Sequence, residues 1–127
     1  MQGLALVFLG AGLGGALRHG VNLGSARFCG TAFPWGTLTV NIVGSFVLGI
    51  LAGWLALKAE QGWSQPLRLF LVTGILGGFT TFSAFSLDAV LLWEKGQAGI
   101  ATAYVAASVI LSIVGLVTGL ALVRVIP

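Results

Sequence analysis

Four apolar stretches run through this chain, and each is long enough to cross a lipid bilayer. They cover residues 4–23, 35–57, 67–93 and 98–126, and short polar loops separate them. A membrane-spanning helix needs about twenty mostly apolar residues. Since lipid offers no hydrogen-bond partners to the N–H and C=O groups of an irregular backbone, each stretch is expected to be helical. The sequence therefore predicts an all-α integral membrane protein, with four transmembrane helices in a single domain over residues 1–127.

The composition excludes the common soluble classes. Hydrophobic residues make up 57% of the chain and charged residues only 7%, whereas a soluble domain carries about 25% charged residues. The net charge of +3 comes from scattered basic residues, so the concentrated basic patch of a nucleic-acid-binding protein is missing. The single cysteine, Cys29, permits neither an intrachain disulfide nor a multi-cysteine metal site. We expect the protein to contact the bilayer and no nucleic acid.

The third stretch contains the segment GGFTTFSAF, from Gly77 to Phe85, which suits a continuous helix poorly. Paired glycines lower helix propensity, and the three hydroxyl side chains compete for backbone hydrogen bonds. We therefore expect a break near Gly77–Thr81, although a simple glycine kink is the alternative. A break at membrane depth must be buried in protein or line a cavity. It also frees carbonyls that can hold a cation and amides that can face an anion.

Two other stretches carry polar side chains at four-residue spacing, which places each row on one helix face. The rows are Thr37, Asn41 and Ser45 in the second stretch, and Tyr104, Ser108 and Ser112 in the fourth. Because polar groups facing lipid are costly, both rows are expected to point inward. Hydrogen bonding between helices would explain one row alone. Two rows beside a broken helix favour a solute pathway.

The polar side chains favour an anion over a cation as the solute. Hydroxyls and an amide donate hydrogen bonds, whereas cation pores are usually lined by carboxylates. Phe82 and Phe85 lie three residues apart on one helix face, and the positive edge of an aromatic ring can contact an anion. Arg18, late in the first stretch, would raise the local anion concentration. The role of the other intramembrane charge, Asp88, stays open.

The basic residues of the loops usually determine which side of a membrane protein faces the cytoplasm. In this chain they are too evenly distributed to do so. One side of a four-span protein would carry Lys58, Arg68 and Arg124, and the other Arg27 and Lys95 with Arg18 nearby. Four short helices also enclose little space for a solute. These observations predict an antiparallel, dual-topology homodimer, with a complex with another protein as the alternative.

The sequence resembles the fluoride channel family called Fluc or CrcB over essentially its full length. The resemblance lies in GALRH around Arg18, PWGTLTVNIVGS around Asn41, and TGILGGFTTFSAFSLD in the third stretch. It implies a fluoride-selective channel of the bacterial inner membrane, multi-pass and electrogenic, which lets fluoride leave the cytoplasm passively and so protects against its toxicity. It also implies antiparallel homodimers with two pores and a central structural sodium ion.

The resemblance further assigns roles to single residues. Phe82 and Phe85 would form a "Phe box" whose ring edges contact fluoride, and Asn41 would donate its side-chain amide in the pore. The hydroxyl donors would be Thr81, Ser83, Tyr104, Ser108 and Ser112. Backbone carbonyls of Gly77 and Thr80 from both subunits would hold the sodium ion.

Three residues depart from the family pattern. Leu116 stands one turn beyond Ser112, where the polar row often continues, and Asp88 stands where glutamate is frequent. Ala84 replaces a common threonine, which removes one hydrogen-bond donor. These departures put the far end of the polar row and any mobile carboxylate in doubt.

Two other kinds of membrane protein stay open as alternatives. A small proton-coupled four-span exporter has the same length and dual topology, but it needs a membrane carboxylate, for which Asp88 is the only candidate. A structural subunit would need no aligned polar rows. An enzyme is not expected, since the sequence shows no nucleophile–base pair and no phosphate loop, and His19 is its only histidine.

Overall fold

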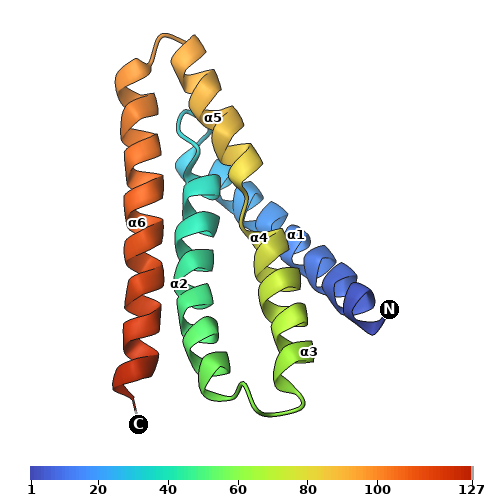
Figure 1. Ribbon diagram of the computed structural model, residues 1–127. Coiled ribbons are helices and arrows are strands. Elements are labelled where there is room, and N and C mark those ends of the chain that lie inside the picture. The colour runs from blue at the N-terminus through green and yellow to red at the C-terminus, as the bar shows by residue number, and fades with distance from the viewer. Residues whose placement is uncertain (127) are drawn as a thin grey trace.

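The computed structural model describes residues 1–126, which form a helical bundle without strands (Figure 1). Four spans are long and apolar enough to cross a membrane: α1 (Gln2–Cys29), α2 (Trp35–Leu57), an interrupted third span (Ser64–Glu94) and α6 (Ala98–Val125). The prediction of four transmembrane helices is therefore confirmed. The second span has the predicted bounds, whereas α1 continues six residues beyond the expected end at Leu23 because its polar last turns stay helical.

The third span consists of four helical pieces and one break. It runs through α3 (Ser64–Arg68), the π-helix η1 (Leu69–Leu76), α4 (Gly77–Phe79) and α5 (Phe82–Glu94). Between α4 and α5 the backbone of Thr80 and Thr81 is extended, with φ/ψ of −85°/159° and −154°/118°. The predicted break is confirmed, but it lies at the threonines, and the paired glycines before it remain helical.

Glycines bring α1 against the first half of the third span. A Cβ atom on Gly14 would clash with the carbonyl of Ile75, and one on Gly78 would clash with the backbone of Ala11. Small residues at such crossings let two helices approach to backbone contact. This contact of Gly78 with α1 explains why the paired glycines stay in the helix α4 despite their low propensity.

The remaining helices form a second packed pair, in which α6 lies along α2 (Figure 1). A Cβ atom on Gly49 of α2 would clash with the carbonyl of Leu116, and one on Gly119 of α6 would clash with the carbonyl of Phe46. The helix α2 thus lies between α6 and the first half of the broken span, whereas α5 packs against α6 directly, and α1 passes behind them at an inclined angle (Figure 1).

Few side chains of the four spans are fully buried within the chain. Between 11% and 28% of the residues in the most apolar window of each span are buried within the chain, so the others keep some surface for lipid or for another protein. The most deeply buried side chains are Val40, Leu55 and Tyr104. Tyr104 belongs to a small core with Leu38, Leu92 and Ala101, which joins α5 and α6 to the start of α2.

Candidate functional site

The break in the third span is fastened to α2 by one asparagine. The Nδ2 of Asn41 donates to the carbonyl of Thr81 at 3.1 Å, and the backbone N–H of Thr81 donates to Oδ1 of Asn41 at 2.8 Å. The side chain thus pairs with the backbone of Thr81 as a second strand would. Because both ends of the amide are used, its orientation is fixed.

This pairing and a helix cap leave two backbone carbonyls without their usual helical donors. In a continuous α-helix each carbonyl accepts from the N–H four residues later. The N–H of Thr81 donates to Asn41 and not to Gly77. The N–H of Ala84 donates to the Thr81 hydroxyl at 3.1 Å and not to Thr80. The carbonyls of Gly77 and Thr80 are therefore open to another ligand.

The carbonyl of Gly78, next to that of Gly77, is already occupied. The Nε of Arg18 donates to the oxygen of Gly78 at 3.0 Å, across 60 residues of sequence. Arg18 lines neither of the polar cavities described below. The structure thus places the predicted anion-attracting arginine at the end of α4.

Two members of each predicted polar row line one groove of about 280 Å³ beside the break, whereas Thr37 and Tyr104 lie outside its lining. Its polar lining comes from three spans: Asn41, Ser45, Thr80, Thr81, Ser108 and Ser112. Phe82 and Phe85 form part of its apolar wall, together with Val109 and Ile113. Ser83 is exposed and lies outside this lining, with its hydroxyl 3.3 Å from that of Thr81.

Two serine hydroxyls in this groove have no protein partner. The Oγ atoms of Ser108 and Ser112 are buried and make no hydrogen bond within residues 1–126. A buried hydroxyl without a partner costs about 1–3 kcal/mol. Two of them, one turn apart on the same face of α6, indicate a place where a hydrogen-bond acceptor or water is held.

The phenylalanines form one end of a chain of aromatic contacts. The rings of Phe82 and Phe85 lie 5.5 Å apart at 56°, which confirms that they share a face of α5. Phe82 is 78% exposed, whereas Phe85 also contacts Tyr104 at 5.4 Å. Tyr104 in turn meets Phe33 edge-on at 5.5 Å. The position of the Phe85 ring therefore depends on Tyr104.

Tyr104 is fixed at its other end by Asp88. Its ring is fully buried, and its hydroxyl donates to Oδ2 of Asp88 at 3.2 Å. Tyr104 does not line the groove that contains Ser108 and Ser112. Its predicted row is thus split: the two serines face the groove, and Tyr104 supports the aromatic wall from behind.

Comparison with known proteins identifies the family. Residues 5–120 match the family model described as CrcB-like protein, Camphor Resistance (CrcB). The chain belongs to the CrcB family.

Several bacterial relatives of this family are similar over nearly their whole length. "Fluoride-specific ion channel FluC" of Rhodopseudomonas palustris is 59% identical over 95% of this chain and 96% of its own. "Fluoride-specific ion channel FluC 2" of Nitrobacter hamburgensis is 56% identical over 94% of each chain. "Fluoride-specific ion channel FluC" of Mesorhizobium japonicum is 50% identical over the full length of both. The family and the names of these relatives point to an ion channel and not to an enzyme.

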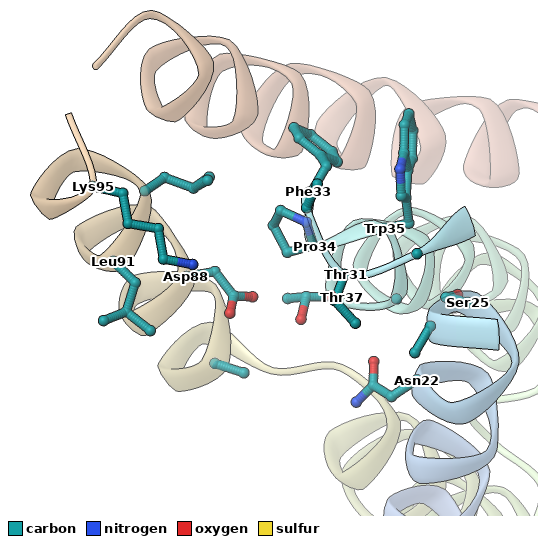
Figure 2. A pocket seen from close by; sticks show the side chains of 16 residues that line it. Asn22, Ser25, Thr31, Phe33, Pro34, Trp35, Thr37, Asp88, Leu91 and Lys95 are labelled. Carbon is teal, nitrogen blue, oxygen red and sulfur yellow. The ribbon is translucent and has the colours of Figure 1, made fainter. Parts of the chain in front are cut away.

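A second polar cavity of this CrcB-family chain, of about 400 Å³, lies beside the start of α2 (Figure 2). Asn22, Thr37 and Asp88 point into it, and Lys95 extends along its wall (Figure 2). Ala84 lines this cavity and not the first one. The helix α5 therefore separates two polar spaces, with Ala84 and Asp88 on one side and Phe82 and Phe85 on the other.

The sequence reasoning missed Asn22 and Lys95 as polar lining. Lys95 follows α5 in a short loop and reads as an ordinary solvated residue. Asn22 offered a usable signal, because it lies one turn after Arg18 within the predicted first membrane span. The two side chains face different partners, however, since Arg18 reaches Gly78 while Asn22 faces the second cavity.

Proposed function

We propose that this chain is a fluoride-selective channel of the bacterial inner membrane, which lets fluoride leave the cytoplasm passively and so limits its toxicity. The observation that carries the proposal is the pair of buried, unpartnered hydroxyls of Ser108 and Ser112 in a groove walled by Phe82 and Phe85. The relatives named fluoride-specific ion channels give the ion.

The chemistry of the groove suits a small anion with tightly held water. Such an ion enters only where strong donors replace its hydration shell. The serine hydroxyls supply donors, and Asn41 keeps a second N–H, because a primary amide has two and one is bonded to Thr81. The positive ring edges of Phe82 and Phe85 add contacts that exclude water. A larger anion such as chloride would fit these fixed donors less closely.

We propose further that two copies assemble as an antiparallel homodimer with two pores. The groove of one protomer is open on the side where Phe82 is 78% exposed. The aromatic ring and the polar ion path beside it need one common covering surface. Lipid tails cannot provide it, because they would leave the polar path exposed. A second, inverted copy of the chain provides that surface, and the balanced loop charges permit inversion.

We propose that a structural sodium ion binds at the centre of this dimer. Unwound backbone carbonyls in membrane proteins commonly coordinate Na⁺. The carbonyls of Gly77 and Thr80 are the two whose helical donors are diverted, to Asn41 and to the Thr81 hydroxyl. Two carbonyls from each copy would bind the ion and join the two breaks.

The proposed function is tested by ion release from liposomes. Purified protein is reconstituted into vesicles loaded with equal fluoride and chloride, and ion-selective electrodes record both anions outside while a potassium ionophore balances charge. We expect rapid fluoride release with little chloride release. Equal release of both anions would refute the selectivity. Release of neither anion would instead favour the exporter or the structural subunit.

A mutation separates the channel from the exporter. An exporter would depend on the carboxylate of Asp88, whereas this carboxylate is bonded to Tyr104 behind the groove. We therefore expect Asp88→Asn to keep passive fluoride release. Loss of release in a folded Asp88→Asn protein, together with uptake driven by a proton gradient in the unchanged protein, would favour the exporter.

A further inference from the structure

Arg18 occupies a carbonyl at the helix break and does not face the ion path. We propose that Arg18 is the permanent cation of this break: it binds the Gly78 carbonyl, leaves those of Gly77 and Thr80 for a metal ion, and restricts that ion to a single positive charge. This inference rests on the proposed sodium site. It assigns to Arg18 a positioning and cation-selecting role.

The position of Arg18 follows from the packing of α1. Gly14 lies one helical turn before Arg18 and is in backbone contact with the carbonyl of Ile75. Gly15 is similarly close to Gly78, since a Cβ on Gly78 would lie 3.0 Å from the Gly15 nitrogen. Residues four apart share a helix face. The face that brings the two backbones together therefore also delivers the guanidinium to the end of α4.

The carbonyl that Arg18 binds is one that the break leaves without a donor. In a continuous helix Gly78 would accept from the N–H of Phe82, but the extended Thr80 and Thr81 interrupt the helix between them. The C-terminal carbonyls of a helix also carry a partial negative charge, which a nearby cation stabilises. Arg18 satisfies the hydrogen bond and the charge at once, at 3.0 Å.

No acid of the described chain is placed to neutralise Arg18 at the break. The three acidic residues are Glu60, Asp88 and Glu94. Asp88 accepts from Tyr104 and lines the second cavity. Glu60 lies in the loop before α3 and Glu94 at the end of α5, and both are exposed. No acidic side chain therefore offsets the positive charge that Arg18 brings to the Gly78 carbonyl, one residue after Gly77 and two before Thr80.

This charge discriminates between metal ions of similar size. Both Na⁺ and Ca²⁺ prefer oxygen ligands such as backbone carbonyls. Electrostatic repulsion is proportional to the charge of the ion, so a divalent ion is repelled by Arg18 twice as strongly as a monovalent one. In a dimer each break brings its own arginine, which doubles the effect. We therefore expect the site to accept Na⁺ and to exclude Ca²⁺.

The inference is tested by the thermal stability of the purified protein in detergent, which reports cation binding without ion transport. NaCl or CaCl₂ replaces choline chloride at constant ionic strength. The unchanged protein is expected to be stabilised by Na⁺ and not by Ca²⁺. Arg18→Gln keeps a hydrogen-bond donor but removes the charge, and should respond to Ca²⁺ at a concentration lower by about tenfold or more.

Two further variants keep the result interpretable. Arg27→Gln removes the same charge from the exposed last turn of α1 and should leave the preference for Na⁺ unchanged. Arg18→Lys keeps the charge and should also prefer Na⁺. An equal response of Arg18→Lys to both ions would overturn the inference, even if Arg18→Gln does not fold.

The outcomes separate this inference from the function on which it rests. If the unchanged protein responds to Na⁺ and Arg18→Gln still excludes Ca²⁺, the charge of Arg18 does not select the ion and only the inference is lost. If the unchanged protein shows no response to Na⁺, the sodium site is refuted and the inference with it. Fluoride release from liposomes remains an independent measure of the channel itself.

Discussion

Asn41 and Thr81 are joined by two hydrogen bonds of 3.1 and 2.8 Å that run in opposite directions between one side chain and one peptide unit. The two residues belong to different spans and lie 40 residues apart. This pairing takes the place of the helical bonds that the extended Thr81 gives up. It therefore ties the shape of the break to α2 and to the groove that Asn41 lines.

Removing the Asn41 amide is expected to impair both the fold of the break and ion release. In Asn41→Ala two hydrogen bonds of about 1 kcal/mol each are lost, and the Thr81 backbone is left without partners. We expect fluoride release to fall by about tenfold or more, with a lower unfolding temperature. Asn22→Ala, which removes the same side chain from the second cavity, is the matched control. Full release by a folded Asn41→Ala protein would show that the pairing is dispensable.

The serine hydroxyls are expected to matter for ion release and not for stability. Because Ser108 and Ser112 donate to no protein group within the described chain, Ser108→Ala and Ser112→Ala break no internal hydrogen bond. We expect an unchanged or higher unfolding temperature and a clear loss of fluoride release. Thr118→Val, at an exposed position of the same helix, should leave release unchanged. A drop in stability without a change in release would identify these serines as structural.

The two phenylalanines are expected to differ in what their loss does to the protein. Phe82→Ile and Phe85→Ile each remove a ring edge from the groove, so both should reduce fluoride release. Only Phe85 contacts the buried Tyr104, and such aromatic pairs contribute about 0.5–1.5 kcal/mol. Phe85→Ile should therefore also lower the unfolding temperature of the protein. Phe28→Ile, at an exposed position near the end of α1, serves as the control, and unaltered release in both groove variants would exclude the ring-edge mechanism.

Tyr104 and Asp88 are expected to act as a unit in stability. Tyr104→Phe keeps the ring contacts but leaves the half-buried carboxylate of Asp88 without its donor, which should cost about 1–3 kcal/mol. Adding Asp88→Asn removes the charge and should recover part of that loss. A thermodynamic double-mutant cycle measures the coupling directly. Additive effects of the two substitutions would mean that the 3.2 Å contact contributes nothing measurable.

The spans and the break were predictable because the bilayer and local chemistry dictate them. About twenty apolar residues in a row leave few alternatives to a spanning helix, and the run GGFTTFS marks where helix formation is weak. The location of the break was not predictable to the residue. Gly77 and Gly78 stay helical because α1 packs against α4 and comes into backbone contact with Gly78. The extended turn falls at Thr80 and Thr81, where Asn41 and the Thr81 hydroxyl offer alternative bonds.

The long-range partners of the polar residues could not be inferred from one sequence. The four-residue spacing shows that Tyr104 shares a helix face with the two serines. It does not show that Asp88 of a neighbouring helix accepts a hydrogen bond from the Tyr104 hydroxyl. Arg18 likewise reads as a charge near an ion path, since nothing local indicates a carbonyl 60 residues away. The π-helix Leu69–Leu76 also has no local signature, and α1 packs along its length.

The final prediction concerns the crossing of α1 and the third span. Gly14→Ala places a methyl group where the Ile75 carbonyl lies, so the two backbones must separate. This separation would also withdraw Arg18 from Gly78, because both contacts come from one face of α1. We expect a lower unfolding temperature and a weaker stabilisation by Na⁺. Gly24→Ala on the same helix meets nothing within 4 Å and should be neutral or slightly stabilising, since alanine favours a helix over glycine by about 1 kcal/mol. Equal behaviour of the two variants would show that α1 does not position the break.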